Sequence, residues 1–233
     1  MSKVKLTIKA TIAVWMTAVV LGAFLLAIPK MPILEHTARN LYFHVPMWFT
    51  LMAALLVSAY QSGKYLRTGN IVHDIRAEQA AWVGVAFGVL GLVTGMLWAR
   101  FTWYTGTGKW WNNDPKQLMA AVQLLIYGAY FVLRSGFDDE RRRARLSGVY
   151  NLFAAATVPF LLYILPRQFT SLHPGADGNP AFDEITDPVM RLVLYPAFIG
   201  FIALFWWIYD QRVRLALVER ALDEQADYAQ PTA

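Results

Sequence analysis

Hydrophobic residues in this chain gather into six long runs, separated by shorter polar segments. The runs extend over Ile8–Ile28, Leu41–Tyr60, Ala80–Trp98, Pro115–Leu133, Ser147–Leu165 and Pro188–Tyr209. Each has about 20 residues, and a helix of that length crosses a hydrocarbon core of about 30 Å. Helices satisfy their own backbone hydrogen bonds inside lipid, so we expect helices. The pattern predicts an all-α integral membrane protein, a bundle of six transmembrane helices forming a single membrane domain over residues 1–233.

Composition agrees with this interpretation and excludes several kinds of chemistry. The chain is 57% hydrophobic and 16% charged, and it has no cysteine. A disulfide framework, a thiolate metal site and a CxxC redox pair are therefore excluded. The first run is too long for a signal-peptide core and lacks a small-residue cleavage pattern, so we expect it to be a retained anchor.

The distribution of lysine and arginine predicts an orientation. One set of connections carries fourteen of these residues: Lys3, Lys5, Lys9, Lys64, Arg67, Arg76, Arg134, Arg141, Arg142, Arg143, Arg145, Arg212, Arg214 and Arg220. The other set carries seven: Lys30, Arg39, Arg100, Lys109, Lys116, Arg167 and Arg191. The positive-inside rule then places both termini in the cytoplasm, and the loops 29–40, 99–114 and 166–187 outside. The basic residues behind the net charge of +5 are distributed as membrane orientation requires, so we expect no nucleic acid partner. The Arg141–Arg145 cluster is an orientation signal or a contact for anionic lipid or a cytoplasmic partner.

The loop between the third and fourth runs is rich in tryptophan. It reads TWYTGTGKWWNNDPKQ and contains Trp103, Trp110 and Trp111. Isolated tryptophans are typical of membrane interfaces, which is our interpretation of Trp15, Trp48, Trp98, Trp206 and Trp207. Three in one short loop instead favour an outward apolar platform on which a planar aromatic ligand stacks.

Asp114, at the end of this loop, has an interpretation that needs no ligand. It precedes Pro115, and Gln117 follows three positions after it, which is the pattern of a helix N-terminus. Asp187 stands before Pro188 in the same way. We expect Asp114 to order the platform by capping the fourth helix.

Two histidines on the predicted outer side flank this platform. His44 lies near the outer start of the second run, and His173 lies just beyond the fifth. Neutral imidazoles on opposite faces of a macrocycle are the axial ligands that haem iron needs. His36 is a weaker candidate, and His73 is expected in a solvated inner loop. Haem propionates require cations, and the outer side offers Arg39, Arg100, Lys109 and Lys116. Each of these cations is equally explained by snorkelling at a helix end.

Other positions predict how the helices meet. Small residues recur in the third run, and polar or proline residues interrupt others: Gly84, Gly88, Gly91, Gly95, Gln123, Pro159 and Pro196. The glycines indicate close helix packing, Gln123 a hydrogen bond between helices, and the prolines kinks.

Three segments resemble a known family, the CcmC proteins, which handle haem in cytochrome c maturation. Arg39–Pro46 resembles the family segment R-x-x-Y-x-H-V-P, Ser171–Gly175 its second histidine segment, and KWWNNDPK (109–116) its Trp-rich WWxWD motif. Two positions differ, because Asn113 replaces a tryptophan of the motif and Lys116 stands where the family usually has arginine. Lysine keeps the charge but loses the planar fork of arginine.

The resemblance implies a role in haem transfer. Proteins of this family hold haem b transiently at the outer face of the bacterial cytoplasmic membrane and pass it to a CcmE-like haem chaperone, beside CcmA/CcmB-like ABC transporter subunits. His44 and His173 would be the axial ligands of the haem iron. The other residues expected to bind haem are Trp103, Trp110, Trp111, Asp114, Arg39 and Lys116. No phosphate-binding loop or CxxCH motif occurs in the chain, so ATP hydrolysis would belong to a partner and no catalytic residue is assigned.

Three alternatives remain open. The membrane subunit of a cytochrome c synthetase (haem lyase) shares the tryptophan motif and outer histidines. A b-type cytochrome would need histidines deep within facing helices. A cofactor-free assembly or permease subunit would leave every residue above with a purely structural role.

Overall fold

The fold was obtained as a computed structural model, which describes residues 3–29, 35–103, 108–173, 185 and 187–229. The helices are α1 (Lys3–Leu25), η1 (Glu35–Asn40), α2 (Leu41–Thr68), α3 (Ile71–Thr102), α4 (Pro115–Ser135), α5 (Glu140–Pro159), η2 (Phe160–Ile164), η3 (Leu165–Gln168) and α7 (Pro188–Ala229). Six helical segments of the described chain are long and apolar enough to cross a membrane, which confirms the predicted all-α membrane fold.

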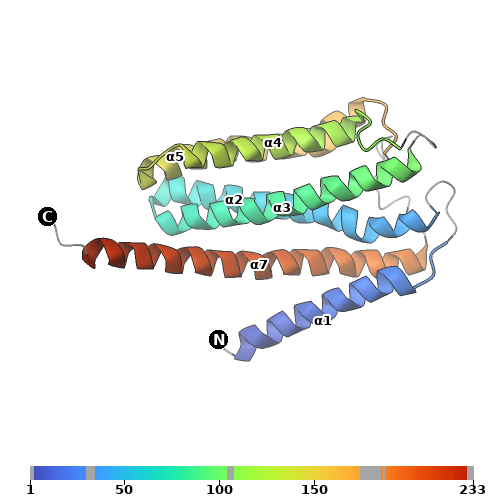
Figure 1. The fold of residues 1–233 in the computed structure, drawn as a ribbon, viewed down its shortest axis with the longest axis horizontal. Coiled ribbons are helices and arrows are strands. Elements are labelled where there is room, and N and C mark those ends of the chain that lie inside the picture. Colours follow the sequence, from blue (N-terminus) through green and yellow to red (C-terminus); the bar gives the residue numbers. More distant parts are fainter. Residues whose placement is uncertain (1–2, 30–34, 104–107, 174–184, 186, 230–233) are drawn as a thin grey trace.

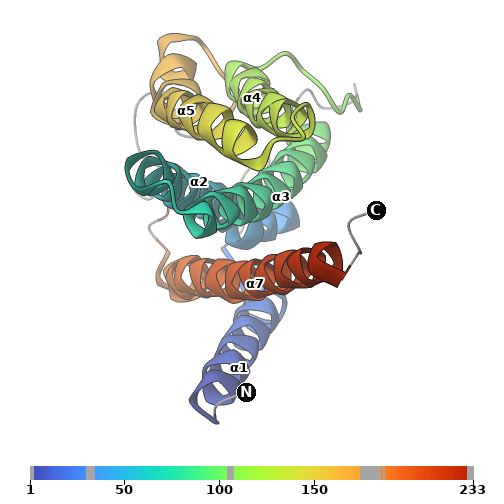
Figure 2. The same ribbon diagram turned by 90° about the vertical axis from the view of Figure 1, so that its left-hand side faces the viewer.

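The long helices run side by side in layers (Figure 1). The central layer consists of α2 and α3, with α4 and α5 on one side and α7 on the other (Figure 2). Helix α1 lies on the outer side of α7, and the start of α1 and the end of α7 lie at the same end of the bundle. The start of α2, the end of α3 and the start of α4 meet at the opposite end, which positions the site described below.

Glycines allow α2 and α3 to pack closely. A Cβ atom added at Gly88 would lie 2.2 Å from Leu51 Cδ1, and one added at Gly95 would lie 2.8 Å from His44 Cε1. Gly84 and Gly91 also face α2 at close range. The small-residue spacing therefore marks a real helix interface, as the sequence predicts.

Buried polar groups in the interior pair with one another between helices. The Asn151 amide of α5 donates to Ser58 and Ser62 of α2 at 2.7 and 2.8 Å, and Tyr127 of α4 donates to Asn151 at 3.2 Å. The expected interhelical role of Gln123 is confirmed, because its side-chain carbonyl accepts from Thr157 at 3.1 Å. In lipid such pairing is the alternative to costly unsatisfied polar groups.

A buried ion cluster joins α3 and α4 at the end of the bundle away from His44. Arg134 is 5% exposed and reaches Asp74 at 2.7 Å and Glu78 at 3.0 Å. Pairing of this kind keeps a buried guanidinium and a buried carboxylate from being left uncompensated. Arg134 therefore does more than mark orientation.

Several elements differ from the predicted spans. Helices α2, α3 and α7 extend well beyond Tyr60, before Ala80 and beyond Tyr209, because helical turns with polar and charged residues continue each apolar span. His73 lies in the first turn of α3, half-buried, with Nδ1 2.8 Å from the Gln61 side-chain oxygen, so the solvated-loop interpretation was wrong. At Pro159, α5 gives way to the π-helical turn η2, as expected where proline lacks the N–H donor of a regular helix.

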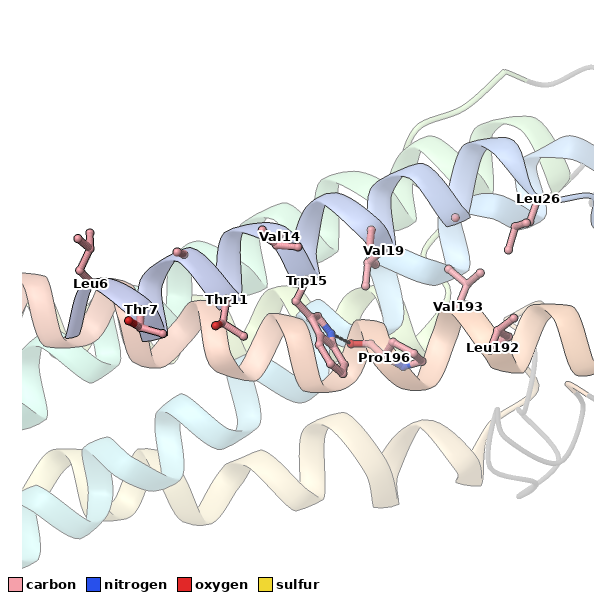
Figure 3. Close-up of a pocket in the computed structure, with 13 residues that line it drawn as sticks. Leu6, Thr7, Thr11, Val14, Trp15, Val19, Leu26, Leu192, Val193 and Pro196 are labelled. Atoms are coloured by element: carbon pink, nitrogen blue, oxygen red, sulfur yellow. Dashed lines mark hydrogen bonds between the residues drawn. The ribbon is translucent and has the colours of Figure 1, made fainter. Parts of the chain in front are cut away.

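An apolar groove of about 790 Å³ lies between α1 and α7 (Figure 3). Leu6, Val14 and Leu192 line it, and the Trp15 indole spans it to donate to the Pro196 carbonyl at 2.9 Å. Its lining contains none of the histidines, so it is separate from the candidate site.

Candidate functional site

His44 lies in the first turns of α2 and is held against α3. Its ring is buried, at 5% exposure, in the space left by Gly95. Its Nδ1 is 3.1 Å from the Thr94 hydroxyl, and the Asn40 amide donates to the Thr94 carbonyl at 3.0 Å. Asn40, at the end of η1, and His44, in α2, therefore both contact Thr94 of α3, which fixes the position of the His44 ring.

His173 comes from a distant part of the chain, after η3, and lies beside His44. The two ring centroids are 6.1 Å apart, and the rings are tilted by 37° to each other. His173 is half-buried, and its Nδ1 is 3.3 Å from the Lys116 ammonium nitrogen. The edge of the Trp103 ring faces it at 6.3 Å between centroids.

Asp114 connects the tryptophan loop to the His173 segment. It caps α4 by accepting from the Lys116 N–H at 2.9 Å, which confirms the N-cap prediction. The same carboxylate accepts from the Ser171 hydroxyl at 2.8 Å and from the Leu172 N–H at 2.9 Å. The second role was missed in the sequence, because no local pattern shows which remote segment a capping carboxylate reaches.

The three loop tryptophans lie in different surroundings. Trp103 contacts His173, whereas the Trp110 ring lies under the Arg100 guanidinium at 4.7 Å and is 46% exposed. Trp111 donates to Asn113 at 2.7 Å.

Gln117 holds the tryptophan loop in a way that the helix-start pattern does not predict. Its side chain accepts from the Asn112 N–H and donates to the Trp110 carbonyl, both at 3.1 Å. It therefore reaches past Asp114 and fixes the chain that carries Trp110 and Trp111.

Arg39 lies in η1 and is half-buried. Its guanidinium donates to the Ala23 carbonyl near the end of α1. This bond ties α1 to the segment that leads into α2. Of the two cations expected to meet propionates, Lys116 therefore contacts a histidine, and Arg39 contacts a backbone carbonyl.

Two tryptophans that we interpreted as interface residues also contact His44. The Trp48 and Trp98 rings meet His44 edge-on at 6.3 and 6.0 Å between centroids. Trp98 also donates to the Thr37 hydroxyl at 3.1 Å. For Trp48 of α2, the signal was the small Gly91 of α3, which leaves room for its ring, whereas Trp98 lies on α3 itself, three residues after Gly95.

The fold and site define a multi-pass helical membrane protein that holds two imidazoles side by side at one end of its bundle. A sequence profile of the CcmC family, described as "Heme exporter protein C", matches residues 1–227. The chain belongs to this family.

Relatives agree with this assignment. "Heme exporter protein C" of Paracoccus denitrificans is 27% identical over 80% of this chain and 76% of its own length. The protein of the same name from Haemophilus influenzae is 25% identical over 78% of this chain and 72% of its own. "Cytochrome c biogenesis protein CcsA" of Prochlorococcus marinus is 30% identical, but over 41% of this chain and 31% of its own length.

Proposed function

We propose that this protein binds haem b transiently at the outer face of the bacterial cytoplasmic membrane and delivers it to a haem chaperone in cytochrome c biogenesis. The observation that carries the proposal is the pairing of His44 with His173, from segments far apart in the chain. Two imidazoles that bind one iron from opposite sides, through nitrogens at about 2 Å, have ring centres roughly 6 Å apart. The observed separation of 6.1 Å fits that arrangement.

The chemistry around the pair also fits haem iron. In each ring Nδ1 faces a partner, the Thr94 hydroxyl or the Lys116 ammonium, so a haem iron would be bound through Nε2. Within the described ranges, no group of three or more His, Cys, Asp or Glu side chains is arranged to hold a metal ion. A metal at these two imidazoles would take its other ligands from outside the described residues, and a porphyrin supplies such ligands.

The surrounding residues have assigned roles in this proposal. Trp103, Trp110 and Trp111 offer apolar ring surface, and Asp114 fixes the loop that carries two of them to the His173 segment. Lys116 and Arg39 meet the propionates through charge-assisted hydrogen bonds. Trp110 is half exposed, which suits cargo that must leave again.

Sidedness and partners complete the proposal. Seven of the 21 Lys and Arg residues belong to the histidine end by the positive-inside count, so this end faces outward and both termini face the cytoplasm. The proposed partners are a CcmE-like chaperone, which accepts the haem, and CcmA/CcmB-like ABC transporter subunits. The relatives' printed name, heme exporter, supports such an assembly.

The test is the visible spectrum of the purified protein co-expressed with its haem chaperone. We expect a Soret band with low-spin features, lost or shifted in His44→Ala and in His173→Ala. His36→Ala is the matched control, because His36 is exposed in η1, and its spectrum should equal that of the parent. A parent without haem under adequate supply, or alanine variants with the parent spectrum, would exclude the ligand pair.

The similarity to CcsA favours a second candidate, the membrane subunit of a cytochrome c synthetase. This chain covers 31% of that protein but 76% of the Paracoccus heme exporter protein C, which favours haem transfer. Incubation of the haem-loaded protein with an apocytochrome c distinguishes the two. Covalent haem on the apocytochrome without any other factor would establish the synthetase role.

A further inference from the structure

The two histidines differ in the group that contacts Nδ1. The Thr94 hydroxyl has one proton, which it donates within its own helix to the Leu90 or Gly91 carbonyl, at 2.9 and 3.0 Å. With its proton on either carbonyl, the hydroxyl accepts from His44, which favours the His44 tautomer protonated on Nδ1. In that tautomer the Nε2 of His44 has the lone pair that a metal ligand needs.

His173 has the opposite arrangement. A lysine ammonium donates three hydrogen bonds and accepts none, so the His173 Nδ1 that faces Lys116 is an acceptor. A neutral ring then carries its proton on Nε2. One nitrogen of His173 is covered and the other is protonated, and neither is ready to bind a metal.

Asp114 keeps Lys116 and His173 together. Its carboxylate binds the backbone N–H of Lys116 on one side and the N–H of Leu172, which directly precedes His173, on the other. One carboxylate thus holds together the two backbone segments that carry Lys116 and His173.

We propose that Lys116 is a positioning residue that keeps His173 from binding iron until an anionic group of the cargo takes the ammonium away. The anion is a carboxylate such as a haem propionate, so this inference rests on the proposed haem-binding function. When the Lys116 ammonium moves away from His173 Nδ1, the proton on His173 moves from Nε2 to Nδ1 through water, and the ring stays neutral. His44 is then the constant ligand and His173 the conditional one, released again when Lys116 returns.

The first experiment uses haem-free protein with ¹⁵N-labelled histidine. The four histidine signals are assigned by single His→Gln variants. We expect His44 with its proton on Nδ1, His173 with its proton on Nε2, and a shift of His173 toward the Nδ1 form in Lys116→Met. Lys64→Met, at the far end of α2, should leave both signals unchanged. A parent His173 protonated on Nδ1, or a Lys116→Met spectrum equal to the parent, would overturn the proposal.

The second experiment compares haem b with its dimethyl ester, which has no propionate charge. In the parent we expect low-spin, two-histidine iron with haem b and mostly high-spin iron with the ester. In Lys116→Met we expect low-spin iron with both. A charge-assisted hydrogen bond corresponds to a change of about tenfold or more in the low-spin to high-spin ratio.

The outcomes separate this inference from the proposed function. If the parent takes up no haem, the proposed function fails, and the haem-free spectra still decide the role of Lys116. If the parent binds the ester in the low-spin form, the proposed role of Lys116 is wrong, but the proposal that the protein binds haem is kept. If Lys116→Met only weakens haem b binding, without a change of spin state, Lys116 is a simple propionate contact and the inference is wrong.

Discussion

At the scale of single residues, the position of His44 depends on an absent side chain. A Cβ at Gly95 would lie 2.8 Å from His44 Cε1, closer than side-chain carbons approach. Gly95→Ala is therefore expected to push the ring away from Thr94 and to remove most of the low-spin haem signal. The measurement is the visible spectrum at matched haem and protein concentrations, together with thermal unfolding in detergent.

Gly128→Ala is the control for this prediction. Gly128 is also helical, in α4, but a Cβ there meets nothing within 4 Å. It should keep the parent spectrum and gain slightly in stability, because alanine favours a helix over glycine by about 1 kcal/mol. A Gly95→Ala protein with the parent spectrum would show that the His44 ring is not held by this contact.

At the scale of elements, Asp114 does more than begin a helix, and a matched pair of variants measures the difference. Asp114 and Asp187 both cap helices that begin with proline, and Asp187 accepts from the Met190 N–H. Loss of a cap costs about 1 kcal/mol. Asp114→Ala also removes the bonds to Ser171 and Leu172, each worth roughly 1.5–3 kcal/mol because the acceptor is charged.

The expected result is therefore a larger loss for Asp114→Ala than for Asp187→Ala. Only Asp114→Ala should raise the rate at which added imidazole displaces His173 from haem iron, because it frees the His173 segment. Stopped-flow spectroscopy gives that rate, and denaturation in detergent gives the stability. Equal effects of the two variants would mean that the hydrogen bonds from Ser171 and Leu172 to Asp114 do not stabilise the protein or hold His173 in place.

The elements also show what hydropathy can and cannot predict. The starts at Leu41, Pro115 and Pro188 agree with the structure, because an apolar run and a helix start coincide there. The sixth predicted run ends at Tyr209, whereas α7 continues to Ala229. Beyond Tyr209 the helix continues into polar residues, stabilised by the pairs Asp210–Arg214 and Arg220–Glu224. Hydropathy reports the lipid crossing, whereas local side-chain pairs decide how far a helix extends into water.

At the scale of the whole molecule, the sequence gives the members of the site more readily than their contacts. His44 and His173 are recognisable because histidine is rare in this chain and both lie near predicted outer ends. The contacts of Thr94 and Trp98 with His44 depend on how α2 and α3 are rotated about their axes, which the glycine spacing only partly specifies. The contact of Lys116 with His173 joins two loops, and no local pattern predicts such a contact.

Orientation in the membrane is the last property of the whole chain that can be tested. The sequence has no cysteine, so single cysteines are unambiguous probes. Ser135→Cys lies at the exposed end of α4, and Thr170→Cys lies in the exposed segment before His173. If the positive-inside count is correct, a membrane-impermeant maleimide added to spheroplasts labels Thr170→Cys and spares Ser135→Cys until the membrane is opened.

The reverse pattern would place the histidine end in the cytoplasm and contradict delivery at the outer face. Labelling of both sites before lysis would contradict the six-span topology. In that topology the fifth span lies between Ser135 and Thr170, so the two residues face opposite sides of the membrane. Ser135 and Thr170 lie on either side of α5, so a labelling difference between them reports directly on whether that segment crosses. The orientation of the proposed haem site follows from that one difference, because His173 is three residues beyond Thr170.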